Sequence, residues 1–489
     1  MTDTDQRPEA DHRAGVAITA AEQAQIARAF EATPPLFGVL STLRTRRMGL
    51  GYRSETGTAE TFEWSSGLSV VQPEGPLAYA SSSPPVPLSE IEEALVAWAA
   101  LGPNGIALAD VAVHGALSSL LSSAGRTIPS SSNDRSVDLF VINDGGTWLY
   151  RPVRDRLSPV EIAGPDDYWK ILDWYRRGRT RLSEHRPDVG WFSAPEGTHN
   201  VNPLGPGQYN LNRPGSTWFL PVGDVGLEWF NLLLTSYEWS GFYLMDAETS
   251  KPAGCDEFIG PGFLEAGFPI PAFDELALLL HAGQVGCVVQ NVRLAAEALG
   301  LGAWPVGSYA DDLLLGAYPE VASGLGFAFL EREATRNPAQ TVTCLGLPGT
   351  LEPVVVPSPR FPTAADAVRY VKELRYQPGA PLSRSDGVAG PFNEPTRREL
   401  LENPRSYISD RTEAAAIRTV EYIVDRYGCC PAYVSPVRAK FSAQVHHVDP
   451  LYYRQFHAGD GGAYPVTPAI DAHFATWHPG EPDPTEAER

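Results

Sequence analysis

The chain has 489 residues, of which 43% are hydrophobic and 20% charged, as is usual for a globular protein with one large domain and extensions. Its formal net charge of −21 argues against a nucleic-acid partner, because an acidic surface repels phosphate backbones. Lysine occurs only at positions 170, 251, 372 and 440, so arginine supplies most of the fixed positive charge.

The sequence predicts a cytoplasmic protein with no membrane partner. The most apolar stretch, 276–304, is interrupted by several polar residues, so no membrane-spanning helix is expected there. The N-terminal sequence MTDTDQRPEADHR lacks the apolar segment of a secretion signal. The five cysteines are odd in number and lack zinc-ligand spacing, which is typical of reduced thiols in a cytosolic protein.

In chain order, the first predicted element is a helix at 20–32, after a charged, mobile tail at 1–18. A second helix is expected at 88–101, because Ser89 and Glu92 form a capping-box pattern at its start. The β-rich run 137–143 and the residues Trp148-Leu149-Tyr150 flank the turn Asp144-Gly145-Gly146, which predicts a hairpin.

The second half of the chain contains the strongest helical pattern. Apolar residues recur at helical spacing over 274–299, and Gly300 is expected to end that helix. The other predicted elements are a helix near 224–238, a strand at 340–347, an extended arm at 354–356, and helices at 363–376 and 411–426. Strands separated by helices indicate an α+β or α/β sandwich.

Several short motifs follow one another along the chain. They are Arg44-Thr45-Arg46-Arg47-Met48, Arg126-Thr127-Ile128-Pro129-Ser130-Ser131-Ser132-Asn133, Gln290-Asn291, Gly300-Leu301-Gly302, Pro305-Val306-Gly307-Ser308-Tyr309 and Leu345-Gly346-Leu347-Pro348. This ordered set resembles the motifs of the nitroreductase-type flavoproteins. The similarity covers roughly 40–150 and 270–362. It is closest to the large subgroup that includes azoline dehydrogenases of peptide natural-product pathways.

The resemblance implies an α+β fold, a nitroreductase-like three-layer sandwich in which a mixed sheet is flanked by helices. The flavin domain would be 19–362 with a central insert at 151–270, followed by a helical C-terminal extension at 363–477 and a mobile tail at 478–489. The family also implies a homodimer that binds FMN at the subunit interface. The aromatic-rich insert would form a lid and substrate walls.

The same resemblance assigns roles to individual residues. Arg46 and Arg47, with the backbone of Met48, would hold the phosphate, and Arg360 resembles a late phosphate-binding arginine. Arg126 would stabilise negative charge on the reduced ring. The polar edge of the ring would contact Pro129, Ser130, Ser131, Ser132 and Asn133, and the backbone of Val306 and Gly307 would lie near the reactive N5. Position in the sequence makes Tyr309 and His281 candidates for an acid or base.

Two residues depart from the family pattern. Met48 stands where the family usually has serine, and Gln284 stands where the azoline dehydrogenases have histidine. The predicted function is hydride transfer through FMN to or from a small organic or peptide substrate, with NADH or NADPH as candidate reductant. The alternatives are an azoline-type dehydrogenase that uses oxygen, and a non-catalytic binding or scaffold protein with the same fold.

A metal site was weighed and is not predicted. His446, His447, Asp449 and His457 are metal-ligand types close together in the sequence. However, two adjacent histidines cannot both face one metal from a regular strand or helix. The sequence also lacks the nucleophile elbow, the Walker A motif and the dinucleotide-binding glycine fingerprint.

Overall fold

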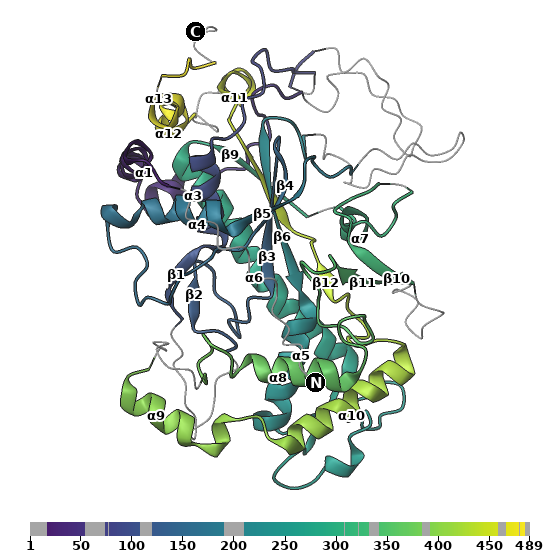
Figure 1. Cartoon of the computed structure of the whole chain (residues 1–489). Helices are drawn as coiled ribbons and strands as arrows, with labels where there is room; N and C mark the ends of the chain where they lie inside the picture. The colour runs from purple at the N-terminus through teal and green to yellow at the C-terminus, as the bar shows by residue number, and fades with distance from the viewer. Residues whose placement is uncertain are drawn as a thin grey trace, which may run out of the picture.

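The computed structural model describes residues 17–53, 74–76, 78–107, 120–189, 210–307, 309–320, 322–331, 342–383, 392–457, 466–478 and 480–484. Residues 1–16 of the first predicted tail and residues 479 and 485–489 of the second lie outside the described residues, as do Trp191, Phe192 and Tyr209 of the proposed lid. Figure 1 shows a long central helix, α6, crossing beside a sheet, with a group of helices below.

One large sheet organises the molecule, with strand order β5-β4-β3-β6-β13-β9 and with β12 also pairing with β6. Its strands are β3 Val137–Asn143, β4 Gly146–Tyr150, β5 Arg179–Ser183, β6 Ser216–Asp224, β9 Gly302–Val306, β12 Val437–Arg438 and β13 Ser442–His446. The α+β class is confirmed. The expectation of a mixed sheet is corrected, because every pairing in this sheet is antiparallel.

The sheet is buried on both faces, which makes it the middle of three layers. Along β3, Leu139 and Val141 pack with the helices on one side, whereas Phe140 and Ile142 pack into a second core on the other. This alternation follows from the two-residue period of a strand. The second core is covered by α7 (Asp311–Leu315) and by the antiparallel pair β10 (Ala328–Glu331) and β11 (Val342–Gly346).

The first layer is built around α6, Ile270–Leu299, which packs on α3, α5 and the strands β6, β9 and β13. Its companions are α1 Ala20–Ala32, α2 Leu36–Thr42, α3 Glu90–Leu101, α4 Trp169–Gly178 and α5 Val225–Thr235. Gly300 ends α6 with φ 79°, a left-handed conformation that favours glycine. The predicted helix at 274–299 is confirmed, although it begins four residues earlier, with Pro271 in its first turn where proline is tolerated.

By length and composition alone, α6 is the one helix among the described residues that is apolar enough to cross a membrane. Its side chains do not support that role. Asp274, His281, Gln284 and Glu297 are all buried, and the helix packs between α3, α5 and the sheet. These are the features of a core helix.

A second group of helices lies below the sheet in Figure 1, where α8, α10 and α5 pack into a separate hydrophobic core. The helices of the C-terminal third are α8 Ala364–Leu374, α9 Glu394–Glu402, α10 Asp410–Tyr427, α11 Pro450–His457, α12 Pro468–Asp471 and α13 His473–Trp477. The remaining elements are a π-helical turn at Ser236–Ser240, 3-10 turns at Pro165–Asp167, Asp256–Phe258 and Pro404–Ser406, and the strands β1 Pro103–Ile106, β2 Ala124–Arg126, β7 Phe242–Met245 and β8 Ala266–Pro269.

Two segments that were expected to be additions to the domain are parts of its sheet. The predicted insert 151–270 supplies β6, which pairs with β3 and β13. The predicted helical extension 363–477 supplies β13, which lies between β6 and β9. Five residues, Ser442–His446, are too short a run for the sequence to identify as a central strand, yet all five are buried.

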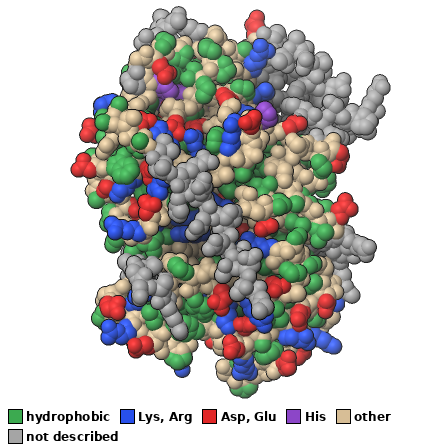
Figure 2. All heavy atoms as spheres, viewed as in Figure 1, with side chains coloured by type: hydrophobic (Ala, Val, Ile, Leu, Met, Phe, Trp, Pro, Cys, Tyr) green, Lys and Arg blue, Asp and Glu red, His purple; other side chains and the backbone are tan. Residues whose placement is uncertain are grey.

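On the face drawn in Figure 2, acidic and basic side chains of the described residues are interspersed, with apolar side chains between them.

Candidate functional site

The loop between β2 and β3 holds the residues that were predicted to bind the ring. Asn133 and Arg135 adopt the left-handed conformation, with φ of 41° and 59°, so the loop turns sharply at this point. The amide nitrogen of Asn133 donates hydrogen bonds to the carbonyls of Ser122 at 2.6 Å and Ala124 at 2.9 Å. These bonds fix the loop against the preceding strand.

Helices α5 and α6 face this loop with buried polar side chains. The Ser131 hydroxyl donates to Glu228 Oε1 at 2.9 Å, and the Gln284 amide donates to Glu228 Oε2 at 3.2 Å. Glu228 also shares a hydrogen bond with Asp134 of the loop. We call Asp134, Asp224, Glu228, His281 and Gln284 the carboxylate cluster.

Burial controls the protonation of this cluster. It raises the pKa of Glu228, and the hydrogen bond with Asp134 and its negative charge raise that pKa further. The Glu228 carboxyl group is therefore protonated at neutral pH. Burial also raises the pKa of Asp224 to about 7, although the backbone N–H groups of Leu227 and Val354 stabilise its charged form.

His281 contributes a neutral imidazole to the cluster. Burial lowers its pKa to about 4, so the ring is uncharged at neutral pH. It packs closely against β6, because a Cβ atom at Gly223 would lie only 1.6 Å from its Cε1 atom. His281 Nδ1 and Gln284 Oε1 are buried and have no hydrogen-bond partner among the described residues. Unpartnered buried polar atoms are costly, so these two atoms point to a bound group.

The structure brings several predicted ring-binding residues to this cluster. Ser130 donates to Asp134 Oδ1 at 3.4 Å, and Ser132 is buried and hydrogen-bonded to Glu228. Pro129 is exposed at the edge of the loop. Arg126 donates to the Val137 carbonyl at 3.1 Å, and the charges of Asp138 and Asp134 act on it.

The charge of Arg360 stabilises the ionised form of Asp224. Its guanidinium lies over the rings of Phe361 and Tyr370, at 5.2 and 4.9 Å from their centroids. Val306 is buried at the end of β9, opposite Ser442 of β13. Gly307 follows directly, and a Cβ atom there would lie 2.8 Å from the ring of Phe441.

The predicted phosphate-binding motif lies at the other end of α6. Arg46 is buried and ion-paired with Glu297, which is thirteen residues, or about 20 Å along the helix axis, from Gln284. Arg47 is exposed, with its guanidinium 4.8 Å from the centre of the Trp304 ring. Met48 is buried, and its backbone N–H donates to the Tyr453 hydroxyl at 3.1 Å.

Sequence reasoning did not identify Asp134, Asp224 or Glu228. A signal was present in the sequence, because Asp224 and Glu228 are four residues apart at the start of the otherwise apolar helix VGLEWFNLLLT. Residues four apart lie on the same face of a helix, and a carboxyl group on an apolar face is costly to bury. The other two candidates, Tyr309 and His281, separate in space, because the Tyr309 hydroxyl donates to the Ala439 carbonyl at 2.6 Å, in the core beyond the sheet.

Comparison with known proteins gives little further information. No protein-family model and no curated protein matches the chain. Among solved structures, the chain is similar to a proposed nitroreductase from Ralstonia eutropha JMP134, with 15% identity over 57% of this chain and 72% of that chain, and a TM-score of 0.24. At that level of similarity no residue role carries over.

Proposed function

We propose that the chain is a nitroreductase-type oxidoreductase that works through FMN, with the polar edge of the flavin ring against the carboxylate cluster. The observation that carries the proposal is the pair of unpartnered buried atoms, Gln284 Oε1 and His281 Nδ1, beside the loop that holds Ser130–Asn133. The polar edge of an isoalloxazine has an N–H donor flanked by carbonyl oxygens. Gln284 Oε1 would accept from the donor, and the Arg126 guanidinium would donate to a ring oxygen.

When bound, FMN would supply the redox chemistry, taking hydride from NADH or NADPH and passing it to a small organic or peptide substrate. The chain's own residues would manage charge and protons around it. The proton on Glu228 lies beside the ring-binding loop, where it is available to a substrate that gains negative charge. Arg126 adds fixed positive charge on the same side.

The phosphate end fits less well than the ring end. The charge of Arg46 is neutralised by Glu297, and the backbone N–H of Met48 is already donated to Tyr453. Of the three residues in the predicted phosphate motif, Arg47 is the one whose side chain is exposed. This observation favours the second candidate, a non-catalytic binding or scaffold protein that keeps the fold without the cofactor. The azoline-type dehydrogenase that uses oxygen is a third candidate, although Gln284 replaces the histidine of that subgroup.

A homodimer in the cytoplasm, with no nucleic-acid or membrane partner, completes the proposal. Its support is the apolar surface of α2, where Leu36, Phe37 and Leu40 are 58%, 84% and 45% exposed. Beside α2 lies an apolar pocket of about 340 Å³, lined by residues of α1, α3 and α6 that include Phe30, Trp98 and Leu294. An exposed apolar helix next to an apolar pocket is typical of a surface that a second chain covers.

The test is flavin binding by the full chain. The purified protein, or the protein reconstituted with FMN, should show a flavin spectrum that NADH or NADPH bleaches without oxygen. Glu228→Gln should weaken FMN binding up to about tenfold, on the scale of one lost hydrogen bond, because Glu228 holds the Gln284 amide and the Ser131 hydroxyl in place. Asp274→Asn is the matched control, because Asp274 is a buried carboxylate fully occupied by Trp229 and the Tyr433 backbone.

Three results would separate the candidates. A chain that stays colourless after reconstitution would overturn the enzyme proposal and support the non-catalytic one. A flavin that is reduced by a peptide substrate and not by a nicotinamide nucleotide would support the azoline-type dehydrogenase. Equal FMN affinity in Glu228→Gln and Asp274→Asn would place the flavin away from the carboxylate cluster.

A further inference from the structure

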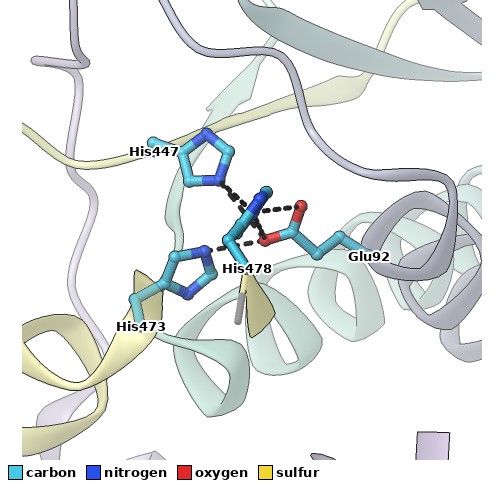
Figure 3. A group of neighbouring side chains, drawn as sticks. All are labelled: Glu92, His447, His473 and His478. Carbon is cyan, nitrogen blue, oxygen red and sulfur yellow. Dashed lines mark hydrogen bonds and ion pairs between the residues drawn. The ribbon is translucent and has the colours of Figure 1, made fainter. Parts of the chain in front are cut away.

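Four side chains of metal-ligand types meet in the interior at the N-terminal end of α3, far from the carboxylate cluster. Glu92 comes from the first turn of α3, His447 follows β13, His473 begins α13, and His478 follows that helix. Their ligand atoms all lie within 4.8 Å of one another. Figure 3 shows the three imidazole rings directed at the carboxylate of Glu92.

Each imidazole is oriented by a hydrogen bond on its far nitrogen. His447 Nδ1 is 2.9 Å from the Val86 carbonyl, His473 Nδ1 is 2.6 Å from the Leu299 carbonyl, and His478 Nδ1 is 3.2 Å from the Glu481 carboxylate. All three partners accept hydrogen bonds, so each Nδ1 carries the hydrogen. In a neutral ring Nε2 is then a bare lone pair, which is the form that binds metal ions.

The Nε2 atoms therefore point lone pairs at a carboxylate oxygen. Glu92 Oε1 is 3.3 Å from His447 Nε2, 2.7 Å from His473 Nε2 and 3.1 Å from His478 Nε2. Without a positive ion between them, these acceptors face one another in a site that water does not reach. Either several protons or one metal cation must hold the group together. A divalent cation satisfies all four atoms at once.

The separations fit a tetrahedral zinc site. A Zn–N distance of about 2.0–2.1 Å places neighbouring ligands about 3.3 Å apart at tetrahedral angles. The separations of the imidazole nitrogens from Glu92 Oε1 run from 2.7 Å, for His473, to 3.3 Å, for His447. The two nitrogens of His447 and His478 are 3.2 Å apart. All four ligand atoms lie within 4.8 Å of one another, and zinc binding would bring them to a common separation of about 3.3 Å.

The site is also enclosed and supported in the way structural zinc sites are. Glu92, His447, His473 and His478 are 0%, 2%, 3% and 6% exposed. The second oxygen of Glu92 accepts a hydrogen bond from the Ser89 backbone at 2.6 Å, which holds the carboxylate in place. Four buried protein ligands leave no open position for a substrate, unlike a catalytic zinc site.

We propose that Glu92, His447, His473 and His478 bind one Zn²⁺ ion that fastens the C-terminal segment 466–484 to the body of the protein. Two ligands come from that segment, and the other two come from α3 and the end of β13. The ion would hold this short segment in place, as a disulfide or a larger hydrophobic core does in other proteins. This site is independent of the proposed FMN site.

The proposal differs from the prediction that the chain has no metal site. Of the residues weighed from the sequence, only His447 belongs to the cluster. His446 points to the other face of the strand end, against Tyr52 with ring centroids 5.0 Å apart, while Asp449 accepts a hydrogen bond from Tyr79 at 2.8 Å. His478, which was assigned to the mobile tail, is one of the ligands.

The first experiment uses the unmodified full chain. After expression with zinc and exhaustive dialysis, elemental analysis should give about one zinc per chain. Exchange with Co²⁺ should give the intense visible bands of tetrahedral cobalt. Less than a tenth of an equivalent of zinc after reconstitution would overturn the proposal, and so would weak bands of six-coordinate cobalt. Neither measurement depends on a variant that must fold.

The second experiment assigns the ligands. His473→Ala and Glu92→Gln should each weaken zinc binding more than about 100-fold, because loss of a supporting residue alone typically costs 10- to 100-fold. His446→Ala is the control, since it removes a neighbouring buried imidazole and leaves all four ligands. The proposal fails if folded His473→Ala retains the zinc affinity of the parent chain, or if His446→Ala loses zinc to the same extent as His473→Ala.

Discussion

The buried ion pair of Arg46 and Glu297 gives the sharpest test of how the predicted phosphate motif is used. Arg46 is 1% exposed and Glu297 is 4% exposed, and Arg46 Nη1 contacts Glu297 Oε2. Among the described residues, Arg46 Nη2 and Glu297 Oε1 have no hydrogen-bond partner. We interpret the pair as a structural element that keeps α6 beside the start of β9, because the Arg46 backbone also donates to the Ala303 carbonyl at 3.1 Å.

The magnitude follows from what each substitution leaves behind. Arg46→Met leaves the Glu297 carboxylate buried without its partner, which should lower the free energy of unfolding by about 3–5 kcal/mol. Glu297→Met should lower the free energy of unfolding by a similar amount, because it leaves the Arg46 guanidinium buried without its partner. The double variant removes both charges and both unpartnered atoms, each of which costs about 1–3 kcal/mol when buried. Its stability should therefore exceed that of either single variant.

The assay is urea unfolding of the parent chain, the two single variants and the double variant, with FMN affinity measured on the same preparations. Arg47→Met is the control, because Arg47 is exposed and its loss should change stability by less than about 1 kcal/mol. The structural interpretation is refuted if Arg46→Met changes stability as little as this control and yet abolishes FMN binding. That result would make Arg46 a phosphate ligand after all.

Three further predictions follow from single features of the fold. The pKa of Asp224 rises from 3.8 to about 7 on folding, so its contribution favours the folded state below about pH 4 and is lost as the pH rises through about 7. Asp224→Asn should therefore raise the free energy of unfolding above pH 7, by up to about 4 kcal/mol. Unfolding curves at several pH values test this, and an ordinary pKa of Asp224 would leave the variant no more stable than the parent chain. Gly223→Ala should destabilise the protein by about 1–3 kcal/mol, because its Cβ would meet the His281 ring. In thermal melts, adding His281→Ala to Gly223→Ala should remove this destabilisation. Phe37→Asp should convert a dimer to a monomer in sedimentation experiments. Leu279→Asp should not, although Leu279 is also apolar and is 67% exposed on α6. A parent chain that is already monomeric would refute the dimer.

The sequence predicted the helices well because their patterns are local. The helix expected at 20–32 matches α1, and those expected at 363–376 and 411–426 match α8 and α10 within two residues at each end. Each is marked by apolar residues at helical spacing together with a capping residue. The extended arm expected at 354–356 forms only a single bridge, between Val356 and Cys430, because a strand needs a partner that local pattern cannot supply.

The domain boundaries were less predictable because strand pairing is non-local. Strand β6 is flanked by β3 and β13, whose nearest residues are more than seventy positions away on one side and more than two hundred on the other. Nothing in the local sequence of Ser442–His446 distinguishes a central strand from a loop. The loop that is predicted to bind the ring lies beside buried polar groups, and its role stays a prediction. Its carboxylate partners were missed because burial, which makes Asp134 and Glu228 unusual, becomes visible only in three dimensions.

The histidine cluster was also hard to predict from the sequence. His473 and His478 have four residues between them, which lies within the His-x₃₋₅-His spacing of zinc ligands, but a pair alone is a weak signal. From the sequence, the deciding ligand, Glu92, is identified only as a helix cap. Its Oε2 caps α3 through Ser89 and also lies 3.2 Å from His478 Nε2, whereas its Oε1 faces all three imidazoles. A capping glutamate is normally solvated, so complete burial of Glu92 implies a compensating positive charge. His447 immediately follows the central strand β13, so the cluster of Glu92 and the three histidines connects the large sheet to the C-terminal segment.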